Sequence, residues 1–230
     1  MSKIKISHVF TSESVGKGHP DKLCDQVSDA ILDACLEKDP HSRVACETMA
    51  GFNLVANVGE VTCRDFETID TEKIARNTVK NIGYDCAELR FCHDSFDYMS
   101  RIHGQSPDIS QGVTAGEGLY DEQGAGDQGM MFGYATNETP EMMPVPIAYS
   151  HRLLKRFERL RRKNVIDYLQ PDAKAQVSVL YDKGQPRRIT SVVVSHQTGH
   201  VSLERIRRDA TDVIRKELDP SGLLDDETEF

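Results

Sequence analysis

The sequence predicts an α+β protein made of two repeated units, each with helices packed on an antiparallel sheet. Two observations support this fold class. The order helix, strand hairpin, helix occurs twice along the 230 residues, and apolar residues alternate in the strand segments but recur every three or four positions in the helical ones. A Gly-rich stretch at 104–133, which holds eight of the sixteen glycines, lies between the two units.

The first unit has clear start and stop signals for its helices. The predicted elements are, in order, a strand at 4–10, a polar loop, a helix at 20–37, strands at 43–50 and 54–63, and a helix at 71–82. Pro20 suits the first helical turn, and Asp39-Pro40 ends that helix. Asp70 or the threonine after it caps the second helix, whose end Gly83 suits.

The second unit repeats this pattern with longer elements. We predict a helix at 145–162, strands at 175–181 and 187–196 around the turn Asp182-Lys183-Gly184, and a helix at 202–217. Seven basic residues lie between Arg152 and Lys163. We interpret this run as a solvated helix face, with a subunit contact as the alternative, rather than as a nucleic-acid patch.

The Gly-rich stretch is either a functional lid or a linker. Its structured-looking pieces, at 105–109 and 124–129, favour the functional interpretation, because a plain linker would carry Ser, Pro or charge repeats. We therefore expect an N-terminal domain at 1–103, a flexible loop at 104–119 and a central domain at 120–230.

Composition excludes several classes of protein. Hydrophobic residues make up 38% and charged residues 28% of the chain, which is typical of a soluble globular protein. The net charge of −9 makes a nucleic acid an unexpected partner. Residues 1–10 do not form a signal peptide and no run reaches the roughly 18 apolar residues of a membrane span. The six cysteines show no Cys-x-x-Cys pair, so we expect reduced thiols in a cytoplasmic protein.

The segment from Glu13 to Lys22 is the first candidate for chemistry. A Gly-containing loop there enters a helix, whose free N–H groups and dipole favour an anion such as phosphate. Glu13 and Asp21 offer hard oxygen ligands for Mg²⁺, and His19 can donate a hydrogen bond to phosphate. The alternative is that Asp21 caps the helix and His19 is packed. The segment is not a Walker A motif.

Two shorter motifs are weaker signals. Three glycines at 124–129 allow a ligand close to the backbone, where Asp127 can bind an amine or a ribose hydroxyl, although a tight turn explains the motif about as well. The run Pro171-Asp172-Ala173-Lys174 precedes a strand, and its plain interpretation is a turn with a surface lysine.

Together these segments resemble one family. Six motifs lie in a single order, namely Phe10–Lys22, Ala45-Cys-Glu-Thr48, Gln105-Ser-Pro-Asp-Ile109, Gly124–Gly129, Phe132–Thr139 and Pro171–Lys174. From about residue 8 to about 196 their order and spacing are similar to those of methionine adenosyltransferases (S-adenosylmethionine synthetases). Six ordered motifs make coincidence negligible.

The resemblance implies a transferase that makes S-adenosylmethionine from ATP and L-methionine, with release of phosphate and pyrophosphate. The thioether sulfur attacks C5′ of the ribose, so no general base is needed, and the charge growing on the triphosphate must be met by cations and donors. The family uses Mg²⁺ and K⁺ and forms active sites between subunits, which implies a homodimer or a higher homo-oligomer. Residues 104–114 would form the lid.

The resemblance also implies roles for individual residues. The implied catalytic residues are His19 and Lys174, and the implied ATP contacts are His19, Asp172 and Lys174. Methionine would be bound by Glu60, through its ammonium group, by Gln105 and by Asp127, which helps to hold methionine or the ribose. The implied metal ligands are Asp21 for Mg²⁺, Glu13 as a second candidate for Mg²⁺, and Glu47 for K⁺.

The sequence departs from the family at several points. Lys17 stands where a non-basic residue is usual and Gln170 where Arg is common, while 49–53 and 164–170 also differ. The family's Gly-Pro-x-Gly-Asp, Thr-Gly-Arg-Lys and Gly-Gly-Gly-x-x-Ser-Gly-Lys-Asp segments, which belong to its last third, are absent from this sequence. We therefore expect the chain alone to have little synthetase activity.

Three hypotheses follow from these departures. The chain is part of a synthetase, through truncation, gene splitting or an incomplete sequence. Alternatively it is a non-catalytic paralogue that binds and regulates a full-length synthetase subunit, or an ATP-binding module alone. The retained charged residues favour the first, because a scaffolding chain has no physical need of them.

Overall fold

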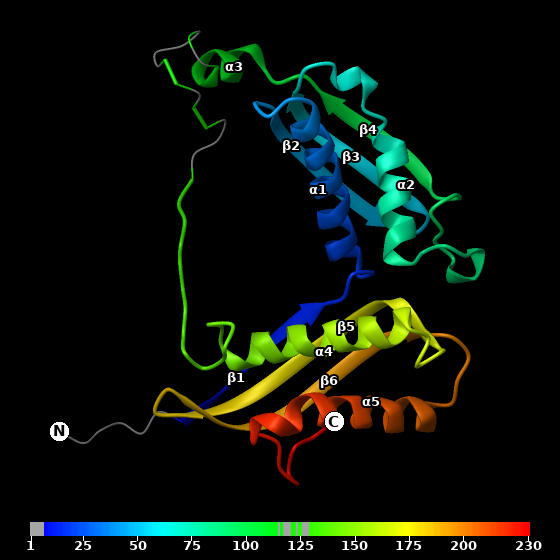
Figure 1. Ribbon diagram of the computed structural model, residues 1–230, viewed down its shortest axis with the longest axis vertical. Coiled ribbons are helices and arrows are strands. Elements are labelled where there is room, and N and C mark those ends of the chain that lie inside the picture. Colours follow the sequence, from blue (N-terminus) through cyan, green and yellow to red (C-terminus); the bar gives the residue numbers. More distant parts are fainter. Residues whose placement is uncertain (1–6, 115, 117–120, 123, 126–128) are drawn as a thin grey trace, which may run out of the picture. The chain divides into compact units, whose positions relative to one another are not determined.

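The computed structural model describes residues 7–114, 116, 121–122, 124–125 and 129–230, and it confirms the α+β fold (Figure 1). Two compact units divide the chain. One unit spans 20–132, and the other combines 133–230 with the N-terminal segment up to His19. The domain boundaries expected near 103 and 120 stay predictions.

The unit at 20–132 contains three helices and three strands within the described residues. They are α1 (Pro20–Lys38), β2 (Arg43–Gly51), β3 (Leu54–Thr62), α2 (Thr71–Ile82), β4 (Asp97–His103) and α3 (Pro107–Val113), with 3₁₀ turns at Phe66–Thr68 and Ala87–Leu89. The four elements predicted here between 20 and 82 are confirmed to within one residue at their ends.

The sheet of this unit has the strand order β2-β3-β4. Strands β2 and β3 form the predicted antiparallel hairpin, whereas β4 pairs parallel to β3. The sequence analysis missed β4, because most of its side chains are exposed and only Tyr98 and Ile102 contribute to the core. Helices α1 and α2 cover one face of the sheet (Figure 1).

Helix α1 buries the residues that the three-to-four spacing predicted, including Leu23, Val27 and Ile31. The termini of α2 are also confirmed. The Asp70 carboxylate accepts a hydrogen bond from the Lys73 backbone N–H at 2.9 Å, and Gly83 follows the helix at a φ of 120°, which a residue without a Cβ adopts readily.

A buried, hydrogen-bonded amide ties the three strands together. Asn57 on β3 is completely buried. Its Nδ2 donates to Thr48 Oγ1 on β2 at 2.7 Å, and its Oδ1 accepts from the Tyr98 hydroxyl on β4 at 2.7 Å. Burial raises the pKa of Tyr98, so its hydroxyl stays a donor. Satisfied buried amides specify strand register, because an unpaired one costs about 1–3 kcal/mol.

Gly59 is the conformationally demanding position of this sheet. Its φ is +134°, and an added Cβ would lie 2.0 Å from the Ala45 backbone oxygen. Only glycine fits such a position. The close approach of the two strands fixes the backbone immediately before Glu60.

In its described part, from residue 7 onward, the second unit is built from three strands and two helices. They are β1 (Ser7–Val15), α4 (Val145–Arg162), β5 (Leu169–Asp182), β6 (Gln185–Thr198) and α5 (Leu203–Leu218), followed by a 3₁₀ turn at Asp219–Ser221. The predicted helices and hairpin are confirmed, and both hairpin strands extend beyond their predicted ends.

Strand β1 joins the second unit through antiparallel pairing with β5, from Ser7 opposite Asp182 to Val15 opposite Lys174. The strand order is β1-β5-β6, with α4 and α5 packed on one face (Figure 1). The expectation of a loop from Thr11 onward was wrong, because Thr11 to Val15 continue β1. Polar composition misled the prediction, since this strand lies at a sheet edge where polar side chains reach solvent.

Glu138 anchors the segment that leads into α4. Its Oε2 accepts hydrogen bonds from the Tyr181 hydroxyl at 2.5 Å and from the Val145 backbone N–H at 3.1 Å. Burial, followed by the neighbouring Glu138, raises the pKa of Tyr181. The end of the Phe132–Thr139 motif therefore has a structural explanation, which is to start α4 and attach it to β5.

We predict that Gly59→Ala lowers the free energy of unfolding by roughly 2–4 kcal/mol, because it combines a strained φ with a steric overlap. Gly51→Ala in the same hairpin is the matched control, since an added Cβ there meets nothing within 4 Å and should change stability by less than about 0.5 kcal/mol. Urea unfolding measures both variants. Equal stability of the two would contradict the close approach.

Candidate functional site

The Gly-rich loop after β1 lies directly against the start of β5. The Gly16 backbone N–H donates to the Ala173 backbone oxygen at 2.7 Å. At Gly18, an added Cβ would lie 2.4 Å from the carbonyl of Pro171. Two motifs more than 150 residues apart in sequence are thereby in backbone contact, and no side chain at position 18 would fit between them.

This contact brings three predicted ATP residues into one electrostatic environment. Burial raises the pKa of the Asp172 carboxyl, while the positive charge of His19 opposes that rise most strongly and Lys174 adds to the opposition. His19 and Lys174 are half-buried, as is Asp172. A carboxylate beside a histidine and a lysine at a Gly-rich loop can hold a polar, anionic ligand with donors and an acceptor.

His196 is a member of this group that the sequence analysis missed. It lies on β6 opposite Ala173, its Nδ1 is 2.9 Å from the Gln197 backbone oxygen, and its ring contacts the Phe157 ring at 5.7 Å. Burial lowers the pKa of His196, against which the nearby Asp172 charge acts. Only the strand register could have identified it, because no motif surrounds it.

Glu13 and Lys174 form an ion pair across β1 and β5, with Glu13 Oε1 3.2 Å from Lys174 Nζ. The Glu13 side chain is 55% exposed and the Lys174 side chain 42%, so solvent screens the pair and it contributes little to stability. The pair matters for the predicted roles of the two residues. Glu13, a predicted Mg²⁺ ligand, neutralises the positive charge of Lys174, a predicted ATP contact. A bound anion would compete with Glu13 for Lys174.

The other unit contains a cavity of about 620 Å³ that brings Glu60 and Gln105 together. Its lining consists of Arg43, Val44, Ala45, Glu60, Gln105, Ile109, Gly124 and Ala125. Strand β3 supplies Glu60, and the segment between β4 and α3 supplies Gln105. Two residues of the predicted 124–129 motif also line the cavity, while Asp127 lies outside the described residues.

Asp21 and Glu47 do not line this cavity. Asp21 is exposed in the first turn of α1, and Glu47 is exposed on β2 opposite Val58. Their carboxylate oxygens fit the hard ions Mg²⁺ and K⁺ by donor chemistry. Glu13 belongs to the other unit. These three metal assignments remain proposals.

Within the described residues, the side chains positioned to share one metal ion are those of Cys92, His93 and Asp94. This trio includes a soft thiol, which Mg²⁺ does not prefer. A hydrogen bond from Cys92 lowers the pKa of Asp94, and Arg76 adds positive charge nearby. The trio is therefore explained as a hydrogen-bonded turn.

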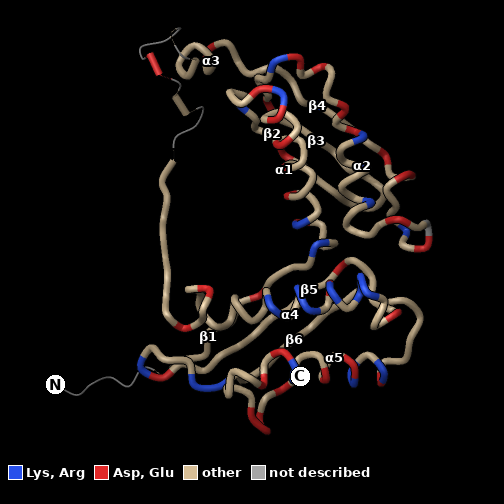
Figure 2. The backbone as a smooth tube through the Cα atoms, viewed as in Figure 1, with Lys and Arg blue, Asp and Glu red and all other residues tan. Residues whose placement is uncertain are grey.

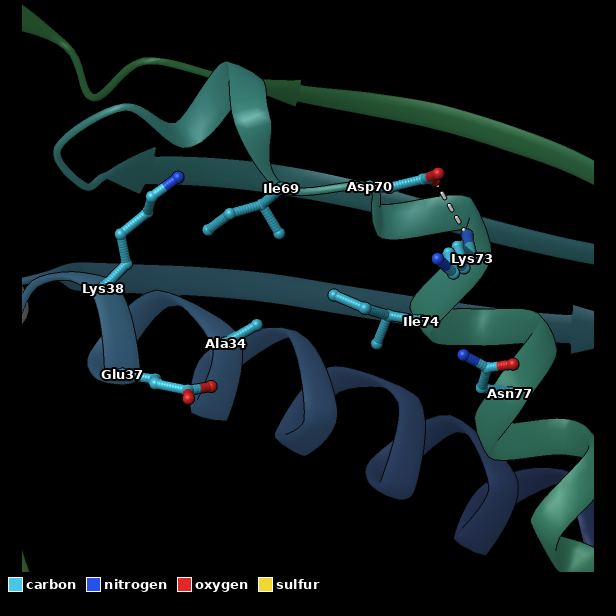
Figure 3. Close-up of a pocket in the computed structure, with 8 residues that line it drawn as sticks. All are labelled: Ala34, Glu37, Lys38, Ile69, Asp70, Lys73, Ile74 and Asn77. Atoms are coloured by element: carbon cyan, nitrogen blue, oxygen red, sulfur yellow. Dashed lines mark hydrogen bonds between the residues drawn. The ribbon is translucent and has the colours of Figure 1, made fainter.

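A second cavity of the 20–132 unit, of about 490 Å³, lies between the C-terminal part of α1 and the start of α2 (Figure 3). Its apolar floor includes Ile69 and Ile74, and charged side chains such as Lys38 and Lys73 surround it. None of the predicted site residues lines it.

Several Lys and Arg residues lie along α4 (Figure 2), and carboxylates pair with part of this basic run. Arg152 pairs with Glu141 at 2.7 Å, while Arg161 and Arg162 both pair with Glu158. Lys155, Arg159, Arg162 and Lys163 of this run are exposed, which agrees with a solvated helix face, whereas the side chains of Arg161 and Glu158 are only 13% and 17% exposed. The absence of nucleic-acid binding stays a prediction. No helix in the described part of the chain is both long enough and apolar enough to cross a membrane.

Comparison with protein families gives two matches. Residues 7–107 match the model described as S-adenosylmethionine synthetase, N-terminal domain. Residues 122–230 match the model described as S-adenosylmethionine synthetase, central domain.

Similar full-length proteins carry the same name. The S-adenosylmethionine synthase of Roseiflexus castenholzii is 50% identical over 232 residues, covering 96% of this chain and 57% of that protein. That of Brachyspira hyodysenteriae is 46% identical, covering 100% of this chain and 59% of that protein. The S-adenosylmethionine synthase of Treponema denticola is 50% identical, covering 96% of this chain and 57% of that protein. The chain thus spans somewhat more than half the length of the curated relatives it matches.

We predict that Asp172→Asn lowers the pKa of His196 further below its ordinary value, because the substitution removes a charge that favours the imidazolium. A ¹H NMR titration of the histidine ring protons measures this. Asp167→Asn is the control, since that carboxylate pairs with Arg205 at 2.8 Å instead. An unchanged or raised His196 pKa in Asp172→Asn would show that the Asp172 charge does not act on His196.

The same shift has a consequence for stability. Between the lowered folded-state pKa of His196 and the unfolded value near 6.5, the unfolded chain binds more protons, so stability falls as pH falls through this window. In His196→Gln this contribution should be absent, which urea unfolding as a function of pH would show.

Proposed function

The chain belongs to the S-adenosylmethionine synthetase family, and from this premise we propose that it carries the substrate-binding residues for joining ATP to L-methionine. In this reaction the thioether sulfur attacks C5′ of ATP and the whole triphosphate leaves. Water then cleaves the triphosphate to pyrophosphate and phosphate before release. The observation that carries the proposal is the backbone contact between Gly18 and Pro171, which unites the two motifs assigned to ATP.

ATP binding is proposed for His19, Asp172 and Lys174. The His19 ring and the Lys174 ammonium group offer hydrogen-bond donors that suit the phosphates, and the Asp172 carboxylate suits a hydroxyl or amine donor. As the bond between C5′ and the triphosphate breaks, charge grows on the leaving oxygen, so a donor such as His19 acts more strongly in the transition state than in the ground state. No residue need remove a proton from the substrate.

Methionine binding is proposed for Glu60 and Gln105, with Asp127 as a further contact. The cavity that both described residues line has an anionic side chain for an ammonium group and the apolar residues Val44 and Ile109 for a thioether chain. Its volume of about 620 Å³ is within the range of small-molecule sites.

The proposed ions are Mg²⁺, held by Asp21 with Glu13 as the second candidate, and K⁺, held by Glu47. When bound, Mg²⁺ supplies positive charge to the triphosphate. The chain's own contribution is the carboxylate oxygens, of which Glu13 Oε1 lies 3.2 Å from Lys174 Nζ.

A homodimer, or contact with a full-length synthetase subunit, is proposed through the open face of the β2-β3-β4 sheet. Helices cover the opposite face, whereas Met49, Val58 and Met99 on this face are 61%, 45% and 46% exposed. Exposed apolar side chains in the middle of a sheet are typical of an interaction surface.

We predict that the 230-residue chain binds Mg²⁺·ATP and that Lys174→Met weakens this binding about 10–100-fold, the range expected for one charge-assisted contact. Lys183→Met, at the exposed turn between β5 and β6, is the matched control and should bind like the unchanged chain. Titration calorimetry measures all three. Equal affinity of the two variants would show that Lys174 does not contact ATP.

A further inference from the structure

Arg43 reaches the Glu60–Gln105 cavity from the first position of β2. Its Nε donates to Gln105 Oε1 at 2.9 Å, and its Nη2 donates to Ser110 Oγ at 3.4 Å. The first contact holds the segment after β4, and the longer second contact reaches α3. A half-buried guanidinium therefore ties the proposed lid to the sheet.

The contact with Arg43 determines which way the Gln105 amide faces. A guanidinium has only N–H donors, so the side of the amide facing it must be the carbonyl oxygen. The Gln105 amide nitrogen then points away from Arg43 as a donor of hydrogen bonds. Without Arg43, either end of the amide could face a ligand.

The cavity lining consequently contains polar groups of opposite character. Glu60 provides a negative charge, while Arg43 and the oriented Gln105 amide provide positive charge and N–H donors. An α-amino acid zwitterion has the matching pair, an ammonium group and a carboxylate. Apolar lining from Ile109 and Val44 completes the match for an apolar side chain.

We propose that Arg43 is a positioning residue for substrate specificity, which orients the Gln105 amide so that the cavity selects the carboxylate of an α-amino acid. This inference rests on the proposed methionine binding at Glu60 and Gln105. It assigns to Arg43 a role in recognising the carboxylate end of the ligand that is separate from the ammonium contact of Glu60.

The test compares L-methionine with L-methioninamide, which lacks the carboxylate, by titration calorimetry on the full chain at a pH of about 6.5, where both α-amino groups are protonated. The unchanged chain should prefer methionine by about 10-fold or more. Arg43→Met should weaken methionine binding by a similar factor, leave methioninamide binding unchanged, and so abolish the preference.

Two further variants sharpen the result. Gln105→Glu places a second carboxylate where the amide donor was, and it should reverse the preference in favour of methioninamide even if Arg43→Met fails to fold. Arg101→Met, an exposed arginine on β4 outside the cavity lining, is the matched control and should keep the preference of the unchanged chain.

The outcomes separate the hypotheses. If Arg43→Met weakened the binding of L-methionine and L-methioninamide equally, the role of Arg43 would be structural and the inference would be overturned. An unchanged preference for methionine in both Arg43→Met and Gln105→Glu would overturn it as well. Failure of the unchanged chain to bind either ligand would overturn the inference together with the proposed methionine site.

Discussion

The loop from Gly16 to Gly18 lies so close to the start of β5 that a Cβ at Gly18 would be 2.4 Å from the Pro171 carbonyl. The arrangement of the proposed ATP residues depends on this backbone contact. It is fixed on one side by the nine-residue pairing of β1 with β5 and on the other by the hydrogen bond from Gly16 to Ala173. Because the contact is made by the backbone, it needs none of the side chains of His19, Asp172 and Lys174.

A similar constraint operates in the other unit. Gly59 allows β3 to approach β2 more closely than any side chain would permit, and the buried Asn57 amide fixes the register of all three strands. Glu60 follows directly, with Gln105 beyond the end of the neighbouring β4. In both units a glycine allows two backbone segments to approach closely. A candidate ligand-binding residue, His19 or Glu60, follows that glycine directly in sequence. Catalytic and binding residues are commonly supported in this way by a rigid scaffold.

The sequence predicted the local elements well and the long-range arrangement only in part. Helices such as α2 carry strong local signals, namely a capping Asp70 and a terminal Gly83, and their bounds were confirmed. The polar continuation of β1 and the edge strand β4 carry weak signals, because exposed strands need no apolar alternation. The approach of Gly18 to Pro171 and the place of His196 depend on strand pairing across the chain, which local patterns do not contain. Arg43 was missed for the same reason, since its partner Gln105 is 62 residues away.

Family membership explains why these motifs occur together, and the use of each unit proposed above rests on the contacts within it. The central claim is that one group of residues receives ATP and a separate cavity receives methionine. Backbone amide NMR of the ¹⁵N-labelled chain, titrated with Mg²⁺·ATP and with L-methionine, tests it most directly. The account predicts that ATP shifts the signals of His19 and of Ala173 with its neighbours, whereas methionine shifts those of Glu60 and Gln105. Shifts confined to other residues, or no saturable shift with either ligand, would contradict it.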